Sequence, residues 1–170
     1  MTKLAPLLLG VMSGKKPPLD DYAVSKETIA REKEEILERA EWLAKKIITT
    51  PRELLESYPR VLGPYYGPQW SIYACVMYIA ALSNIARIWP DQKAKSLERI
   101  EKLLPLLLSE ELRRYDTREW KEDALKSLSG PKHHLTYLSL LVWSISLYRL
   151  AGGGREYDGL FRDCCEALPT

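Results

Sequence analysis

The sequence from Gly63 to Trp89 reads GPYYGPQWSIYACVMYIAALSNIARIW, and this stretch decides the fold. Its first eight residues, up to Trp70, are rich in glycine, proline and aromatic side chains, a composition typical of a rigid loop. The residues that follow carry no charge until Arg87. A helix that is apolar on nearly every side must be covered on nearly every side. We therefore predict a central helix that an aromatic loop precedes and that Trp89-Pro90 ends.

A second apolar helix is predicted from about His134 to Leu150, because threonine and serine are its only other polar side chains before Arg149. Three glycines from Gly152 end it. A helix needs about 20 apolar residues to span a bilayer, whereas the uncharged stretches 70–86 and 135–148 hold 17 and 14 residues. Both also alternate with strongly charged segments, which favours buried helices over membrane spans.

The remaining helices are predicted to be amphipathic and to lie outside these two. Apolar residues recur at helical spacing with charges on the opposite side. These segments are 25–48, 91–107 with a kink or end at Pro105, one possible further turn at 109–114, and about 156–168. No alternating β-branched run predicts a strand. The predicted fold is all-α, built from antiparallel helical hairpins with two apolar inner helices and amphipathic outer helices.

Two short helices are predicted from capping boxes, in which a Ser, Thr or Asp cap is followed three residues later by Glu. The first box is Thr50 to Glu53 with proline at the first helical position, and its helix ends near Tyr58-Pro59. The second box is Asp116 to Glu119, and its helix runs to Leu128 with Trp120 on the apolar side.

Length and composition bound the class of protein. The 170 residues are enough for one domain with a sizeable core, and we predict a single domain over 25–170 after a flexible arm, 1–24. The net charge is +2 with scattered basic residues, so no nucleic-acid footprint is present. Ten Tyr and five Trp against one Phe suit either half-wet pocket walls and interfaces or ordinary amphipathic packing.

The cysteines and the N-terminus bear on location. Three cysteines, one inside the apolar helix and two adjacent at 164 and 165, do not make a disulfide framework. A reducing, cytoplasmic compartment is the simplest prediction. Residues 1–14 resemble a short signal segment, which would imply a secreted or periplasmic protein, but they lack a clear cleavage site.

The loops that precede the two inner helices are predicted to meet at one end of the body, because antiparallel hairpins bring both N-termini there. These loops are 58–70 and 115–134. Helix N-termini supply free N–H groups and partial positive charge for a polar ligand. The shared rim of the two loops is the predicted site.

Four residues of the second loop are candidates for acid/base chemistry. Asp123 lies on the flank of a buried face, where desolvation would raise its pKa, unless it pairs with Arg118, Lys121 or Lys126. Asp116 is most simply a helix cap. His134 and Tyr137 share one helix face and form a possible proton-transfer pair, although a capping histidine is the alternative. No zinc site or cofactor is predicted, since no HExxH-like spacing exists.

Four residues of the first loop are candidates for substrate binding by stacking and hydrogen bonding: Tyr65, Tyr66, Gln69 and Trp70. The alternative is that they plug the end of the helix bundle. No Walker loop, G-x-G-x-x-G or G-x-S-x-G motif is present.

The inner and outer alternation, the GPYYGPQW loop and the residues from Trp120 to Tyr137 look like α/α-toroid enzymes over roughly 23–168. That superfamily includes six-hairpin glycosidases, polysaccharide lyases, sugar epimerases and terpenoid-acting enzymes, in which helical hairpins form a ring around a cleft. The resemblance implies part of an enzyme that acts on a saccharide-like polar ligand. This chain supplies two to three hairpins, so it would be a fragment of a longer chain or would associate with copies of itself.

The alternative hypothesis is a non-catalytic helical module for interaction or oligomerisation. A partial ring leaves the flanks of its inner helices uncovered, and uncovered apolar patches mark interaction surfaces. The enzyme hypothesis requires the eight candidate residues to meet in one open cleft, whereas the module hypothesis does not.

Overall fold

The computed structural model describes residues 25–168, apart from the side chains of Arg60, Pro64 and Tyr65, and divides into two compact units, 1–38 and 39–170. In the first unit the described part is the beginning of helix α2 (Lys26–Ile47). The Ser25 hydroxyl caps it by accepting a hydrogen bond from the Thr28 amide at 3.1 Å, as predicted. The predicted arm and signal-like segment lie outside the described residues.

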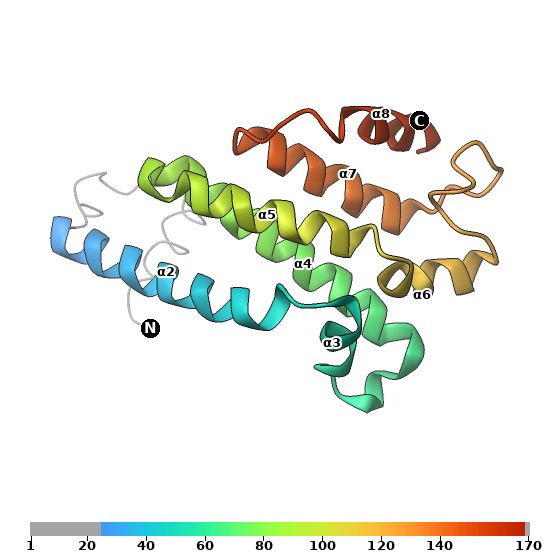
Figure 1. Ribbon diagram of the computed structural model, residues 1–170, viewed down its shortest axis with the longest axis horizontal. Coiled ribbons are helices and arrows are strands. Elements are labelled where there is room, and N and C mark those ends of the chain that lie inside the picture. The colour runs from blue at the N-terminus through green and yellow to red at the C-terminus, as the bar shows by residue number, and fades with distance from the viewer. Residues whose placement is uncertain (1–24, 169–170) are drawn as a thin grey trace, which may run out of the picture. The chain divides into compact units, whose positions relative to one another are not determined.

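The second unit is built from helices (Figure 1). After the end of α2 these are α3 (Pro51–Glu56), α4 (Gly63–Ile88), α5 (Lys93–Leu107), α6 (Glu110–Trp120), α7 (Leu135–Leu150) and α8 (Asp158–Ala167), with 3-10 turns at Arg60–Leu62 and Pro90–Gln92. No strand occurs in the described part of the chain. The all-α prediction is confirmed.

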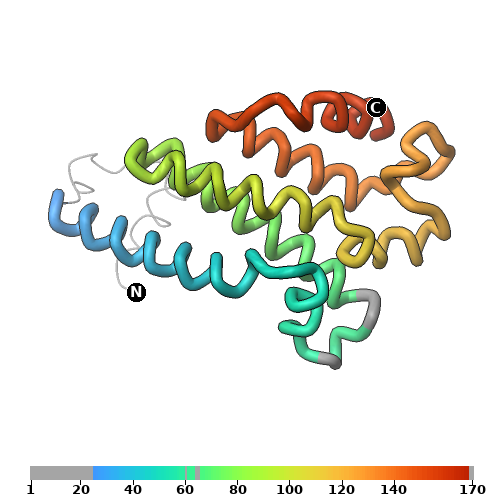
Figure 2. Tube along the Cα trace, viewed as in Figure 1, coloured from blue at the N-terminus to red at the C-terminus, as the bar shows by residue number. Residues whose placement is uncertain are grey.

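The two apolar helices α4 and α7 are the inner helices, as predicted. Helix α4 packs against α5, α6 and α7, and Figures 1 and 2 show α4 and α7 running in the same direction while α5 runs in the opposite one. Near the C-terminal ends of both inner helices, the Ser83 hydroxyl donates a hydrogen bond of 3.0 Å to the Leu147 carbonyl. The α4–α5 hairpin is therefore antiparallel and the two inner helices are parallel.

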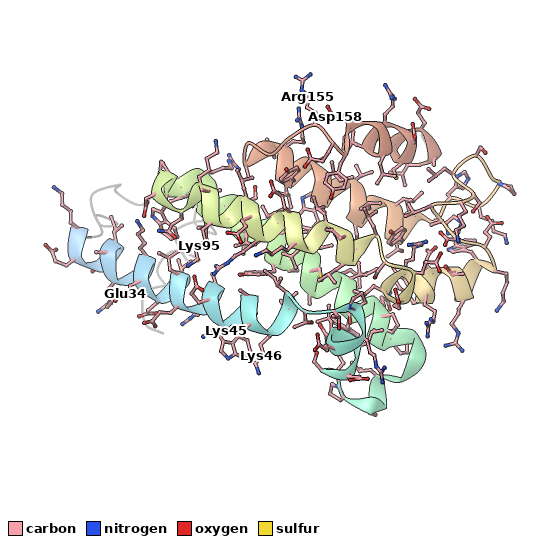
Figure 3. All side chains as sticks on the ribbon, in the orientation of Figure 1. Glu34, Lys45, Lys46, Lys95, Arg155 and Asp158 are labelled. Carbon is pink, nitrogen blue, oxygen red and sulfur yellow. The ribbon has the colours of Figure 1, made fainter. Side chains whose placement is uncertain are left out.

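The outer helices are amphipathic. Helix α5 buries a leucine-rich face that includes Leu103 and Leu104, because these positions recur at helical spacing. Charged side chains on the exposed side of α2 point outward, as Figure 3 shows for Lys45 and Lys46. The amphipathic pattern of this unit was therefore predictable from the sequence.

Three contacts tie the end of α2 to the inner and outer helices. The buried Tyr78 hydroxyl of α4 donates a hydrogen bond of 2.6 Å to the Ala40 carbonyl. Glu41 pairs with Arg99 at 2.5 Å and also with Lys95, both on α5. Hydrogen bonds from these two cations lower the pKa of Glu41 from 4.5 to about 2.

The Glu41 pair predicts a pH-dependent contribution to stability. A carboxyl whose pKa is lowered in the folded state stabilises above its unfolded pKa and loses that effect as pH falls. Glu41→Gln should therefore lower the free energy of unfolding at neutral pH by about 1 kcal/mol or less, as solvent-screened pairs do. The difference from the parent should vanish between pH 4.5 and about 2. Urea titrations across this range measure it.

Glu38→Gln is the matched control, because Glu38 is exposed on the same helix and has no ion-pair partner among the described residues. A Glu41→Gln effect that stays constant down to pH 2 would contradict the assignment of the lowered pKa.

The predicted aromatic loop is wrong in its extent, because α4 already begins at Gly63. Proline is tolerated in the first turn of a helix, where its missing N–H has no partner to lose, and Pro64 lies there. Pro68 lies about one turn further in, within the helix. Tyr65 to Trp70 are therefore the first turns of the inner helix rather than a rim loop.

The second predicted capping box is also wrong. Asp116 lies inside α6, which begins after Ser109, whose hydroxyl accepts from the Leu112 amide. The helix ends at Trp120, and Lys121 takes the left-handed conformation at φ 62°. Residues 121–134 form turns instead of the predicted helix to Leu128. The first box is confirmed, since Thr50 and Glu53 cap α3 reciprocally.

Residues Tyr66–Ile88 are long and apolar enough, by length and composition alone, to cross a membrane. Core helices of proteins that never meet a bilayer share this property. Somewhat more than half of this segment is buried inside the protein. It is thus the central helix of the second unit.

Candidate functional site

A buried histidine–aspartate pair joins α6 to the start of α7. His134 has no exposed surface, and its Nδ1 lies 2.5 Å from Oδ2 of Asp116, which is also buried. His134 precedes α7 in the left-handed conformation, φ 44°, which histidine adopts more readily than most residues. Burial raises the pKa of Asp116, although the hydrogen bond with His134 acts in the opposite direction.

The second ring nitrogen of His134 is also occupied. Its Nε2 lies 3.3 Å from Oε1 of the half-buried Glu122, and the Trp120 ring lies 5.8 Å from the imidazole at a tilt of 60°. The imidazole is therefore held between two carboxylates and covered by an indole. Among the described residues no group of three or more His, Cys, Asp or Glu side chains is arranged to hold a metal ion.

An ion pair between buried Arg113 and half-buried Asp123 joins the same helix to the turns that follow it. Arg113 donates from Nε and Nη2 to the two carboxylate oxygens of Asp123 at 2.9 and 2.7 Å, and from Nη1 to the Leu108 carbonyl. These hydrogen bonds lower the pKa of Asp123. The expected rise of the Asp123 pKa is thus wrong, and the alternative of an ion pair is confirmed. Its main partner is Arg113, which the sequence did not suggest, and Lys126, which it did, lies 3.8 Å from the same carboxylate.

Tyr137 does not face His134. Its hydroxyl donates to the Leu107 carbonyl at 2.9 Å, at the C-terminal end of α5, and the side chain is buried. Burial raises the pKa of this phenol. Tyr137 thus joins α7 to α5, and the expected proton-transfer pair with His134 does not form.

The chemistry open to this cluster follows from its burial. A histidine oriented by a carboxylate can act as a general base only when its other nitrogen reaches a substrate. Here that nitrogen faces Glu122 and the imidazole has no exposed surface. The pair fixes the turns of 121–134 between α6 and α7, so we interpret it as a structural connection.

An open pocket of about 770 Å³ lies elsewhere, between α3, the first turns of α4 and α6. Its charged residues are two arginines and two glutamates: Arg52, Arg114, Glu56 and Glu111. Arg52 pairs with Glu56 at 2.9 Å, while Leu55, Tyr58, Pro59 and Pro68 supply much of the rest of the wall. The described lining residues therefore carry equal numbers of positive and negative charges.

The predicted site residues do not meet in this pocket. Seven of the eight have described side chains, and none of these seven is among its lining residues. Asp116 and His134 come together, whereas Asp123 and Tyr137 have other partners. The side chain of Tyr65 lies outside the described residues. The predicted meeting of both loops in one cleft is therefore not what this pocket presents.

Two of the predicted aromatics, Tyr66 and Trp70, lie instead on an exposed strip of α4. Tyr66 is 55% exposed and Trp70 is 52% exposed, while Gln69 is half-buried. The ring centroids of Trp70 and Tyr73 lie 5.9 Å apart, with the rings tilted by 58°. Met77 and Ile88 continue the strip at 55% and 64% exposure. We call this strip the α4 face. Its members are Tyr66, Trp70, Tyr73, Met77, Ala81, Asn84 and Ile88.

The α4 face is a continuous, uncharged surface. Its members are separated by three or four residues, so they lie on one side of the helix. The opposite side of α4 is covered by core contacts, with Cys75, Val76 and Ile79 fully buried. The helix is thus apolar on all sides, but the rest of the protein covers only one side of it. The α4 face is the side that stays exposed.

Sequence reasoning missed Arg113, Glu122 and the pocket. Arg113 was not predictable as the partner of Asp123, because the two residues are ten positions apart. The predicted helix also continued past Trp120, where α6 in fact ends. A usable signal was present in Ser109 followed by Glu110 and Glu111, a cap residue with acidic residues in the first turn. Extending the predicted turn at 109–114 into a full helix from this cap would have given the observed start of α6 and placed Arg113 within that helix.

Together these features define an all-α protein of helical hairpins with a buried polar connection at one junction and an uncovered inner-helix face. No protein-family model, curated protein or solved structure matches the chain. The resemblance to α/α-toroid enzymes therefore stays a prediction from the sequence pattern.

Proposed function

We propose that this chain is a helical interaction module whose docking surface is the α4 face. The observation that carries the proposal is the exposure of Tyr66, Trp70 and Met77, each by more than half, on a helix that has no charge over 63–86. Contiguous exposed apolar patches mark interaction sites. Tyr, Trp and Met are also the residue types enriched where proteins meet.

The enzyme hypothesis receives less support. It needs an acid/base group within reach of a ligand, and His134 has no exposed surface while Arg113 neutralises Asp123. The parallel course of α4 and α7 is what a toroid-like arrangement would need, and it serves a docking module equally well. Action on a saccharide-like ligand is therefore the weaker of the two proposals.

Photo-crosslinking in cells that produce the protein tests the docking surface. A benzophenone amino acid at position 77 is expected to give a protein adduct, because Met77 lies at the centre of the α4 face. The same group at Val61, which is 90% exposed in a 3-10 turn outside the face, is the control and should not give that adduct.

Two results would count against the proposal. Adducts of equal yield at positions 61 and 77 would indicate unspecific labelling. A label at 77 that enters lipid instead of protein would favour a membrane surface for the α4 face, which half-exposed Trp and Tyr also suit.

A further inference from the structure

We propose that the partner of the α4 face is a second copy of this chain, packed antiparallel about a two-fold axis beside Met77. The inference rests on the proposed function and names the partner of the same surface. It follows from the spacing, the residue sizes and the area of the face.

The α4 face is symmetric in sequence about Met77. Tyr73 and Ala81 lie four residues from it on either side. Its outer members, Trp70 with Asn84 and Tyr66 with Ile88, are likewise equidistant from it. In a two-fold antiparallel pair, a residue before the axis meets the partner's residue at the same separation after it. Every position of the face then has a facing position.

The residue sizes are complementary in that pairing. The first half of the face is aromatic and the second half is smaller, so Tyr73 meets Ala81 and Trp70 meets Asn84. Well-packed helix interfaces alternate large and small residues across facing positions. A parallel pairing would instead place Trp70 against Trp70 and leave a gap at Ala81. Antiparallel packing also opposes the two helix dipoles.

The one amide on the face fits the same arrangement. Asn84 carries the only side-chain amide among the seven residues, and its oxygen accepts hydrogen bonds. The indole N–H of Trp70 needs an acceptor once the ring is covered. Facing positions 70 and 84 bring this donor and acceptor together twice in each dimer.

The area and charge of the face suit self-association. A fully covered aromatic side chain buries roughly 150–250 Å², so the half-exposed members together leave roughly 600 Å² on each copy. Two copies would bury roughly 1,200 Å², the lower end of stable interfaces. No member of the face is charged, so the copies meet without repulsion, and a charged partner surface would gain no ion pair there.

Sedimentation of the purified full chain across a dilution series tests the proposal. The expected species at high concentration has twice the mass of one chain. Met77→Glu places two carboxylates beside the axis and should weaken the dimer about a hundredfold. Because Met77 is exposed, the helical circular dichroism should remain unchanged. Val61→Glu, another exposed apolar residue outside the face, should leave the dimer intact.

Disulfide trapping tests the direction of the two helices. In a Cys165→Ser background, which removes the exposed native thiol, Tyr73→Cys and Ala81→Cys should crosslink when the two variants are mixed. Asn84→Cys alone should not crosslink. A strong Asn84→Cys homodimer would overturn the antiparallel arrangement, because that pairing occurs only when the helices are parallel.

The outcomes separate this inference from the proposed function. A chain that is monomeric at every concentration overturns the self-association, whereas a dimer that survives Met77→Glu overturns the α4 face as its interface. If a monomeric chain still gives a specific protein adduct from position 77, the α4 face remains the proposed docking surface and its partner is a different protein. If position 77 gives no adduct and the chain is monomeric, both proposals fail.

Discussion

Replacing His134 with alanine is expected to lower the free energy of unfolding by about 3–5 kcal/mol, because removing one member of a buried pair leaves the other charge uncompensated. Asp116 is 3% exposed and its carboxylate has His134 at 2.5 Å. The substitution also removes the group that holds Glu122 at 3.3 Å. Urea denaturation followed by circular dichroism measures the change.

The adjacent histidine provides the control for this prediction. His133 is exposed, and its contact with the Ala167 carbonyl is long, at 3.4 Å. His133→Ala should change stability by no more than about 0.5 kcal/mol. Equal effects of the two substitutions would show that the pair with Asp116 does not anchor the α6–α7 junction.

Replacing Arg113 with alanine is expected to be the second most destabilising change, by about 2–3 kcal/mol. The substitution removes two hydrogen bonds to Asp123 and one to the Leu108 carbonyl. The effect is smaller than at His134 because the Asp123 side chain retains 15% exposure and water can partly replace the guanidinium. The same urea titrations measure it.

A double-mutant cycle with Asp123→Ala isolates the pair, and its coupling should exceed about 1 kcal/mol. Because Arg113 lowers the pKa of Asp123, the coupling is present at neutral pH and lost as pH falls below the ordinary value of 3.8. Arg114→Ala is the control, since Arg114 is the next residue on the same helix and its side chain is exposed. Coupling that persists at strongly acidic pH would argue against the ion pair.

Much of the fold was predictable because it depends on local patterns. The apolar runs of α4 and α7 require burial wherever they occur, and the Thr50 box satisfies its helix end with residues three positions apart. These signals need no knowledge of distant partners. Most of the helices were accordingly identified with nearly correct ends, apart from the start of α4 and both ends of α6.

The site was less predictable because it depends on contacts between distant residues. The spacing from Asp116 to Glu119 matches a capping box, yet the Asp116 carboxylate is hydrogen-bonded to His134, 18 residues later in the chain. Burial on α6 competes with the local capping preference, since Leu112 and Tyr115 turn that helix toward the core. Glycine and proline in GPYYGPQW indicate a loop by composition, but prolines near a helix start are compatible with the helix.

The two buried polar pairs also control access to the turns that they bracket. Residues 121–134 contain the sequence Ser-Gly-Pro at 129–131, a composition typical of loops. Exposed loops of small and polar residues are preferred sites of proteolytic nicking. A protease must draw a segment into its cleft in an extended form, which here requires Asp123 and His134 to leave their partners together. This connection should consequently resist digestion for as long as α6 and α7 remain joined, and the first cut in it should report the opening of that junction.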